Sequence, residues 1–250
     1  MINNTALHFS RLQQTAAVWG LLLLIGIGFA LKPQLKETEL VQELKGRKSI
    51  DSVVASFGGA ARQRLEPKFA EASVDYPPKS IILVGLKTEK VLEVYARDAK
   101  GQEQHVCTYP ILGTSGVLGP KLKEGDKQMP EGFYRIREFE PNSSYHVALR
   151  LDYPSPFDKE RGKDDGRSHL GSDIMIHGKD KSVGCLAMGD PAAEDIFVLV
   201  HDVGLENTEL LISPYDFRKP PSGISLPDSP KWITSVYQDL RRRIRQLSRA

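Results

Sequence analysis

Short apolar runs separated by tight polar turns occupy the middle of this chain. The first run, Ile81–Val84, is rich in branched side chains, a second run is Val91–Tyr95, and a third strand is predicted at Glu103–Ile111. Lys87–Lys90 and Asp98–Gly101 supply the turns between them. Strands joined by such short turns pair with their neighbours as an antiparallel meander. The pattern therefore predicts a sheet that begins with the first of these runs.

Beyond the meander, shorter strands alternate with long polar stretches. Further strands are predicted at Phe133–Arg137, Tyr145–Leu151 and Thr208–Ser213. The polar stretches 113–130 and 154–169 have no periodicity, and both are predicted to be loops. Long loops in compact domains often carry function. The second of them would suit a surface lid beside a site.

One helix is predicted late in the domain, at Pro191–Val203. Asp190 can act as its N-cap, and proline fits the first turn of a helix. Gly204 can end it.

The C-terminal segment 217–250 combines a proline-rich tail with an amphipathic helix. Its apolar positions are spaced alternately by four and three residues, which places them on one helical face. They are Ile233, Tyr237, Leu240, Ile244 and Leu247. The other face is rich in arginine. We expect the apolar face to pack back on its own domain, although a basic amphipathic helix can also lie on an anionic membrane or bind a partner.

The N-terminal segment 1–31 is predicted to direct export. It contains the uncharged apolar run Thr15–Leu31, which is at the short end of what spans a bilayer as a helix and longer than the usual core of a secretory signal. Either a cleaved signal or a retained inner-membrane anchor would place the remainder in the periplasm or on the outer face of the inner membrane. Residues 32–78 are predicted to be a linker with short helices, because Gly58-Gly59 interrupts any long one.

Composition narrows the possible functions. A chain of 250 residues with 40% hydrophobic content can form one main domain with appendages. The net charge of +2 gives no reason to propose nucleic acid as a partner. Cys107 and Cys185 are too few for a disulfide framework. No Cys or His pair has the usual structural-zinc spacing, so neither a metal nor another cofactor is predicted.

A candidate nucleophile and a candidate base lie on either side of one short loop. The apolar run Ile174–Ile176 leads into His177, and Cys185 follows a glycine after the loop. A free thiol is only a few per cent thiolate at neutral pH, and a neighbouring imidazole can take its proton. This pairing suggests acyl transfer through a thioester. Spacing alone leaves purely structural roles open, because a cysteine after glycine is commonly a buried small hydrophobe.

The segment Ser172–Asp190 (SDIMIHGKDKSVGCLAMGD) resembles the signature of the YkuD-type L,D-transpeptidase catalytic domain, a family of bacterial cell-wall cysteine enzymes. The segments Gly119–Ile136 (GPKLKEGDKQMPEGFYRI) and Pro141–His146 (PNSSYH) are most similar to the YafK-like branch of that family. The resemblance implies a mainly β, α+β fold, in which residues 79–216 form a β-sandwich catalytic domain with short helices.

The resemblance implies roles for five residues of this signature. Cys185 would be the nucleophile and His177 the base. The carbonyl of Gly178 would orient the imidazole, backbone N–H groups around Gly184 and the cysteine would hold an oxyanion, and Ser182 would support the loop.

Two lysines outside the signature, Lys121 and Lys123, could contact carboxylates of a cell-wall peptide, or could simply lie in a solvated basic loop. The chain departs from many family members at Val183, where they have histidine, and at Ala187, where they have arginine or asparagine.

The implied substrate is a peptidoglycan stem peptide, whose diamino-acid residue would form a thioester with the cysteine. An amine acceptor, from a second stem or a lipoprotein lysine, would give transpeptidation. Water would give an amidase or endopeptidase that releases lipoprotein or peptide. A cell-wall binding module without catalysis is an alternative of a different class. A thiol redox role is disfavoured, because there is no Cys-x-x-Cys pair.

Overall fold

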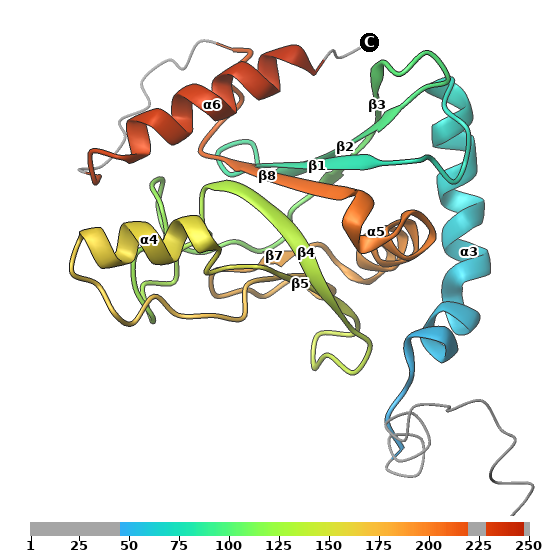
Figure 1. Ribbon diagram of the computed structural model, residues 1–250. Helices are drawn as coiled ribbons and strands as arrows, with labels where there is room; N and C mark the ends of the chain where they lie inside the picture. The colour runs from blue at the N-terminus through green and yellow to red at the C-terminus, as the bar shows by residue number, and fades with distance from the viewer. Residues whose placement is uncertain (1–45, 220–228, 248–250) are drawn as a thin grey trace, which may run out of the picture. The chain divides into compact units, whose positions relative to one another are not determined.

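The computed structural model describes residues 46–219 and 229–247. The chain divides into a unit Met1–Ser49 and a unit Ile50–Ala250, and every named helix and strand lies in the second unit (Figure 1). The elements are α3 (Ile50–Glu71), β1 (Ile81–Leu86), β2 (Val91–Arg97), β3 (Glu103–Pro110), β4 (Gly132–Glu140), β5 (Ala148–Leu151), α4 (Pro156–Asp164), β6 (Met175–His177), β7 (Leu186–Ala187), α5 (Asp190–Val203), the 3-10 turn η1 (Leu205–Asn207), β8 (Thr208–Ser213) and α6 (Ile233–Gln246).

The predicted export segment 1–31 lies outside the described residues, as do residues 32–45 and part of the proline-rich tail. Within the described part of the chain, no helix is both long and apolar enough to cross a bilayer. The choice between a signal and an anchor therefore stays a prediction.

The eight strands of the described residues share one mixed sheet, in the order β3-β2-β1-β8-β4-β5-β6-β7. The predicted meander is confirmed, because β1, β2 and β3 pair in antiparallel fashion. The sheet as a whole is not antiparallel, since β1 also pairs in parallel with β8, with Ile81 opposite Thr208. A strand from late in the chain, β8, therefore lies in the middle of the sheet between β1 and β4.

Strand β4 joins the two halves of this sheet. Its first residues pair with β8, and from Ile136 onward it pairs with β5, with a register shift between Ile136 and Glu138. Such an irregularity bends a strand and increases its twist. The ladder consequently curls into a half-barrel rather than the expected sandwich of two separate sheets (Figure 1).

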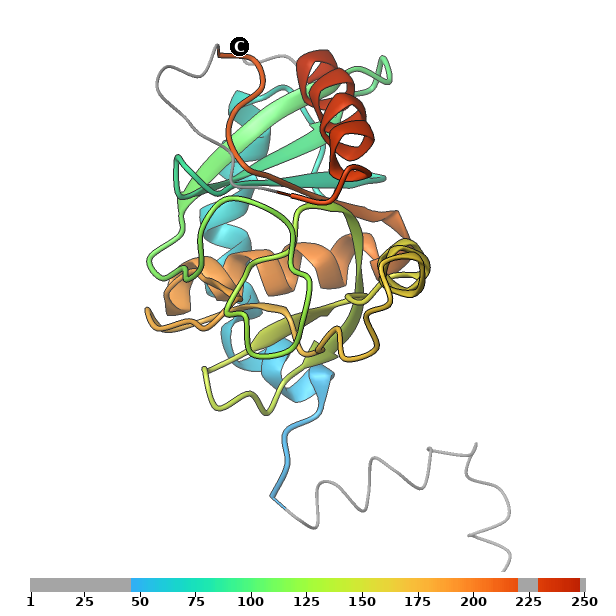
Figure 2. The same ribbon diagram turned by 90° about the vertical axis from the view of Figure 1, so that its left-hand side faces the viewer.

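Helices α3 and α5 pack against each other and against one face of the sheet (Figures 1 and 2). The prediction that Gly58-Gly59 would interrupt the helix is wrong, because α3 is continuous through both glycines. Each glycine costs roughly 1 kcal/mol relative to alanine in a helix. Burial of one apolar stripe, which includes Leu65, together with the two-hydrogen-bond pair of Arg62 with Asp202 on α5, outweighs that cost.

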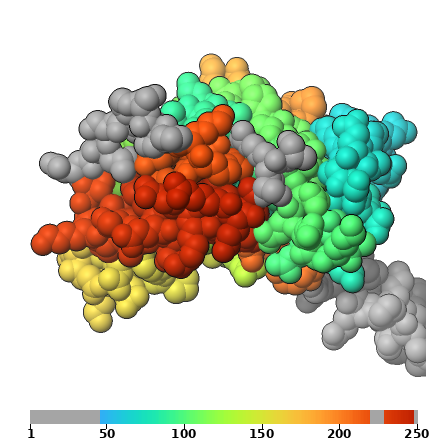
Figure 3. All heavy atoms as spheres, turned by 90° about the horizontal axis from the view of Figure 1, so that it is seen from above, coloured from blue at the N-terminus to red at the C-terminus, as the bar shows by residue number. Residues whose placement is uncertain are grey.

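Helix α6 covers the opposite face of the sheet, as expected from its pattern (Figures 1 and 3). Leu240 and Ile244 are fully buried there and pack in one cluster with residues of β1 and β8, including Val84 and Leu211. On the polar side, Arg243 makes two hydrogen bonds of 2.7 Å with Glu103. The C-terminal helix is thus part of the domain core.

Two local predictions around the helices are wrong. The polar stretch 154–169 contains α4, which Ser155 starts with a reciprocal capping box to Asp158. A capping box satisfies otherwise unpaired N–H groups and compensates for a weak apolar face. Helix α5 begins after Gly189, and the Asp190 side chain accepts a hydrogen bond from the Lys179 backbone N–H instead of capping the helix.

Candidate active site

The candidate residues share one face of strands β5, β6 and β7. Ile176 of β6 pairs with Leu149 on one side and Leu186 on the other, and all three side chains are buried in the core. Because side chains alternate along a strand, the residues before and after Ile176 point to the opposite face. His177 therefore projects from the same face as Cys185, which directly precedes Leu186.

Two rows cross this face, which we call the catalytic face. One row is Ala148, His177 and Ala187, and the other is Arg150, Met175 and, just before β7, Cys185. The imidazole and the thiol are diagonal neighbours on adjacent strands, a relation that brings long side chains within reach of each other. The sheet register thus brings together the base and the nucleophile expected from the sequence.

The His177 ring is buried and has a defined tautomer. Its Nδ1 lies 2.6 Å from the Gly178 carbonyl oxygen, and a carbonyl can only accept, so Nδ1 carries the proton. In the neutral imidazole Nε2 is then the acceptor. Burial lowers the pKa of His177, and the Gly178 carbonyl offsets this only partly. The ring also contacts Tyr145, with 4.6 Å between the ring centroids.

Gly178 occupies a position where no side chain fits. A Cβ there would lie 2.5 Å from Oδ1 of Asp190 and 2.7 Å from the Tyr145 carbonyl oxygen. The carbonyl that orients His177 is therefore fixed between α5 and the segment before β5.

The Cys185 thiol is partly buried, and its Sγ lies 3.5 Å from the Asp173 carbonyl oxygen. Burial raises the pKa of this thiol, while the Met175 N–H and the charges of Lys121 and Arg150 act in the opposite direction. The second thiol, Cys107, packs against the core from β3, and burial raises its pKa to about 11. Both cysteines are free.

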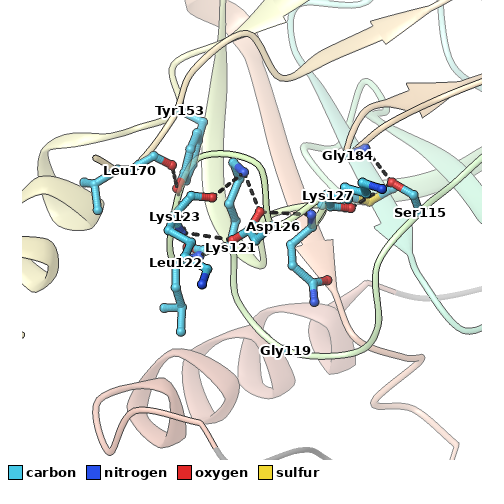
Figure 4. Close-up of polar contacts among 12 residues, drawn as sticks. Ser115, Gly119, Lys121, Leu122, Lys123, Asp126, Lys127, Tyr153, Leu170 and Gly184 are labelled. Carbon is cyan, nitrogen blue, oxygen red and sulfur yellow. Dashed lines mark hydrogen bonds and ion pairs between the residues drawn. The ribbon is translucent and has the colours of Figure 1, made fainter. Parts of the chain in front are cut away.

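Two serine hydroxyls hold the cysteine loop. Ser182 Oγ accepts a hydrogen bond from the Cys185 N–H (2.8 Å) and donates to the Cys185 carbonyl oxygen (2.7 Å). Ser115 Oγ accepts from the Gly184 N–H (2.8 Å) and donates to the Lys127 carbonyl oxygen, as Figure 4 shows. The two N–H groups expected to bind an oxyanion are thus both occupied by hydroxyls in this state.

The loop 113–130 is organised around its own ion pair. Lys121 is buried, and its Nζ lies 2.6 Å from Oδ1 of Asp126 and 3.0 Å from the Lys123 carbonyl oxygen (Figure 4). The Lys123 side chain is exposed. The structure therefore places the charge of Lys121 within the loop, near enough to act on the thiol but already paired.

Sequence reasoning missed four residues around this site, namely Ser115, Tyr145, Arg150 and Asp173. Arg150 could have been found from strand alternation, because it is a cation on the polar side of the predicted strand 145–151. Ser115 lies in a segment without regular pairing, so no periodicity marked it. Tyr145 was expected at the start of a strand, but β5 begins only at Ala148, so its contact with His177 could not be read from strand alternation. No group of three or more His, Cys, Asp or Glu residues suited to a metal ion occurs in residues 46–219 and 229–247.

Comparison with known proteins supports this reading of the signature. The chain is 35% identical over 135 residues to "Putative L,D-transpeptidase YafK" of Escherichia coli K12, and equally to the protein of that name from E. coli O157:H7. The match covers 53% of this chain and 52% of each relative. The chain thus matches about half the length of these curated relatives.

Two solved structures have similar chain paths. The helical cell shape determining protein Pgp2 of Campylobacter jejuni aligns with a TM-score of 0.46 and 24% identity, over 60% of this chain and 55% of that one. Bdellovibrio bacteriovorus Bd1075 aligns with a TM-score of 0.39 and 21% identity, over 70% and 59%. Both scores lie below 0.5, and neither structure assigns a role to a residue here.

The family model described as the L,D-transpeptidase catalytic domain, YkuD, matches residues 79–208. That span is just over half of the 250 residues and contains both the histidine and the cysteine of the signature. This chain belongs to the YkuD family of L,D-transpeptidase catalytic domains.

Proposed function

We propose that this chain is a cysteine acyltransferase that acts on peptidoglycan stem peptides, with Cys185 as nucleophile and His177 as base. Family membership supports the peptidoglycan-related function. The observation that carries the residue roles is the shared catalytic face, on which a neutral imidazole with an acceptor Nε2 lies diagonal to a free thiol.

In the proposed reaction, Nε2 of His177 takes the proton of the Cys185 thiol as Sγ attacks the carbonyl carbon of the diamino-acid residue. The C–N bond to the next residue breaks, and the departing amine takes the proton from the imidazolium. A thioester remains on Sγ. An amine acceptor then attacks the thioester, gives up its proton to His177 and releases the thiolate, which is reprotonated.

The resting pair would be uncharged. Burial lowers the pKa of His177 and raises that of Cys185, and both directions disfavour an imidazolium–thiolate pair. At neutral pH the thiol would therefore transfer its proton to His177 as it attacks the substrate carbonyl, rather than rest as a thiolate. The developing oxyanion would take over the Gly184 N–H from the Ser115 hydroxyl, which makes that hydrogen bond in this state.

The acceptor decides between the two versions of this chemistry. An amine gives the transpeptidase, and water gives the amidase or lipoprotein-releasing enzyme, from the same thioester. The 35% identity to YafK, which covers about half of each chain, is compatible with either version. We propose the transfer reaction first and treat hydrolysis as an outcome of the test.

The test is intact-mass spectrometry of the chain without its N-terminal segment after incubation with a peptidoglycan tetrapeptide. Wild type should gain a thioester adduct, and Cys185→Ala should gain none. His177→Ala should form it far more slowly, whereas Cys107→Ala serves as the matched control and should behave as wild type. Product ratios with and without an added amine separate transferase from amidase. Absence of adduct and turnover, with tetrapeptide binding retained in Cys185→Ala, would favour the binding module.

We also propose export, with the catalytic unit in the periplasm or on the outer face of the inner membrane. The uncharged run Thr15–Leu31 supports this placement, as does a substrate class that lies outside the cytoplasm. Fractionation of cells that express the full chain, followed by N-terminal sequencing, would separate a cleaved signal from an anchor. Recovery of the chain in the cytoplasm would refute the proposal.

A further inference from the structure

Arg150 is the one cation that strand alternation places on the catalytic face of β5, and the proposed reaction assigns it no role. It lies directly opposite Glu138 on β4 and Met175 on β6, in the row that ends at Cys185. Its side chain is only 16% exposed. A guanidinium held in this row faces the sulfur across one intervening strand.

The Arg150 guanidinium lies among carboxylates on two sides. It pairs with Oδ1 of Asp173, lies 3.3 Å from Oε2 of Glu138 and lies 3.6 Å from Oε2 of Glu140. Of these contacts the one with Asp173 is a hydrogen bond, whereas Nε of Arg150 is buried without a hydrogen-bond partner among the described residues. Asp173 is therefore the carboxylate to which the guanidinium is bound.

Asp173 connects this cation to the nucleophile. Its backbone carbonyl is the group that Sγ of Cys185 contacts, and its φ is +60°. That left-handed conformation is uncommon for a residue other than glycine and persists only where surrounding contacts hold it. The ion pair to Arg150 and a hydrogen bond from Ser172 Oγ supply such contacts.

We propose that Arg150 is a positioning residue for Cys185, which it serves by binding Asp173, whose carbonyl contacts the thiol, and by keeping a positive charge on the catalytic face. The proposal rests on the proposed function only in taking Cys185 as the nucleophile. Its consequence is that the charge balance between Arg150 and Asp173 sets how readily the thiolate forms.

The charged and titratable groups around the thiol come from several elements. They are Arg150 on β5, His177 on β6, Asp173 just before β6, and Lys121 in the loop 113–130, which is itself paired with Asp126. Removal of the Arg150 charge should disfavour the thiolate. Removal of the Asp173 charge should favour it, because less of the guanidinium charge is then neutralised. A merely structural role predicts no such opposite shifts.

The experiment measures the alkylation rate of Cys185 by iodoacetamide as a function of pH, in a Cys107→Ala background and without substrate. Arg150→Met should raise the midpoint by about half a pH unit, which lowers the rate at pH 7 about threefold. Arg150→Lys, which retains the charge, should leave the midpoint near that of wild type. Asp173→Asn, which tolerates the left-handed backbone, should lower it. Arg161→Met, which removes a similarly paired cation from α4, is the matched control and should not shift it.

An unchanged midpoint in a folded Arg150→Met protein would overturn the proposal, as would shifts of the same sign in Arg150→Met and Asp173→Asn. If Arg150→Met does not fold, Asp173→Asn decides, and absence of a downward shift there overturns the proposal. The readout needs no substrate. A chain that alkylates as expected but forms no thioester would therefore refute the proposed function and leave this inference standing.

Discussion

A buried lysine that contacts the loop 113–130 should be among the most costly residues to replace. Nζ of Lys87 lies 2.7 Å from Oε1 of Glu131 and donates to three backbone carbonyls of the segment 117–129, at 3.0 to 3.1 Å. The two side chains are 7% and 0% exposed. Lys87→Met would leave a buried carboxylate whose remaining partners are the Gly119 N–H and the Tyr237 hydroxyl.

Breaking a buried ion pair from one side costs about 3–5 kcal/mol, because the remaining charge stays desolvated. We expect a loss of that size in the free energy of unfolding of Lys87→Met, measured by urea denaturation with circular dichroism. Adding Glu131→Gln should recover part of the loss, because no buried charge then remains. Lys100→Met, at an exposed turn, is the matched control and should lie within about 0.5 kcal/mol of wild type. A loss below about 1 kcal/mol for Lys87→Met, or no recovery in the double variant, would refute the reasoning.

Three further predictions follow from the site and the core. Because burial lowers the pKa of His177 and the base must be neutral, kcat/KM should fall only as the pH drops below about 6.5, and an acid limb centred above 7 would contradict this. Gly178→Ala forces a Cβ against Asp190, so it should lower the free energy of unfolding by about 1–3 kcal/mol, measured by thermal denaturation, and remove most of the turnover. Gly59→Ala, in open space on α3, should instead raise the free energy of unfolding by about 0.5–1 kcal/mol. Leu240→Ala should cost about 2–5 kcal/mol by urea denaturation, and an unchanged midpoint would mean that α6 does not pack on the sheet in solution.

The pattern of apolar residues and turns was sufficient to predict the strands whose positions depend on neighbouring residues. The runs at β1 and β2 are apolar, and β1, β2, β3 and β8 are all bounded by turns or loops, so their positions follow from the sequence. The continuity of α3 does not follow from the sequence pattern. It depends on ion pairs between its arginines and carboxylates of α5, which are more than a hundred residues away in the chain. The half-barrel likewise depends on the bend within β4, for which the sequence carries no clear periodic signal.

The same distinction holds at the site. His177 and Cys185 stand in a signature that can be recognised in the sequence, and strand register then explains why they meet. Ser115 escaped prediction because its partner, the Gly184 N–H, is brought to it only by the folding of two loops. The buried pairing of Lys121 escaped it too, since a lysine in a basic loop is usually solvated.

The parallel pairing of β1 with β8 has a consequence for the order of folding. Residues 81–86 find their central partner only at 208–213, near the opposite end of the domain. Contacts between such distant parts of a chain form slowly, because a long loop must close before they give any stability. The middle of the sheet therefore cannot assemble until synthesis has passed residue 213. A chain that ends before residue 208 would retain the histidine and the cysteine but lack the strand that joins the β1–β3 meander to the strands bearing them.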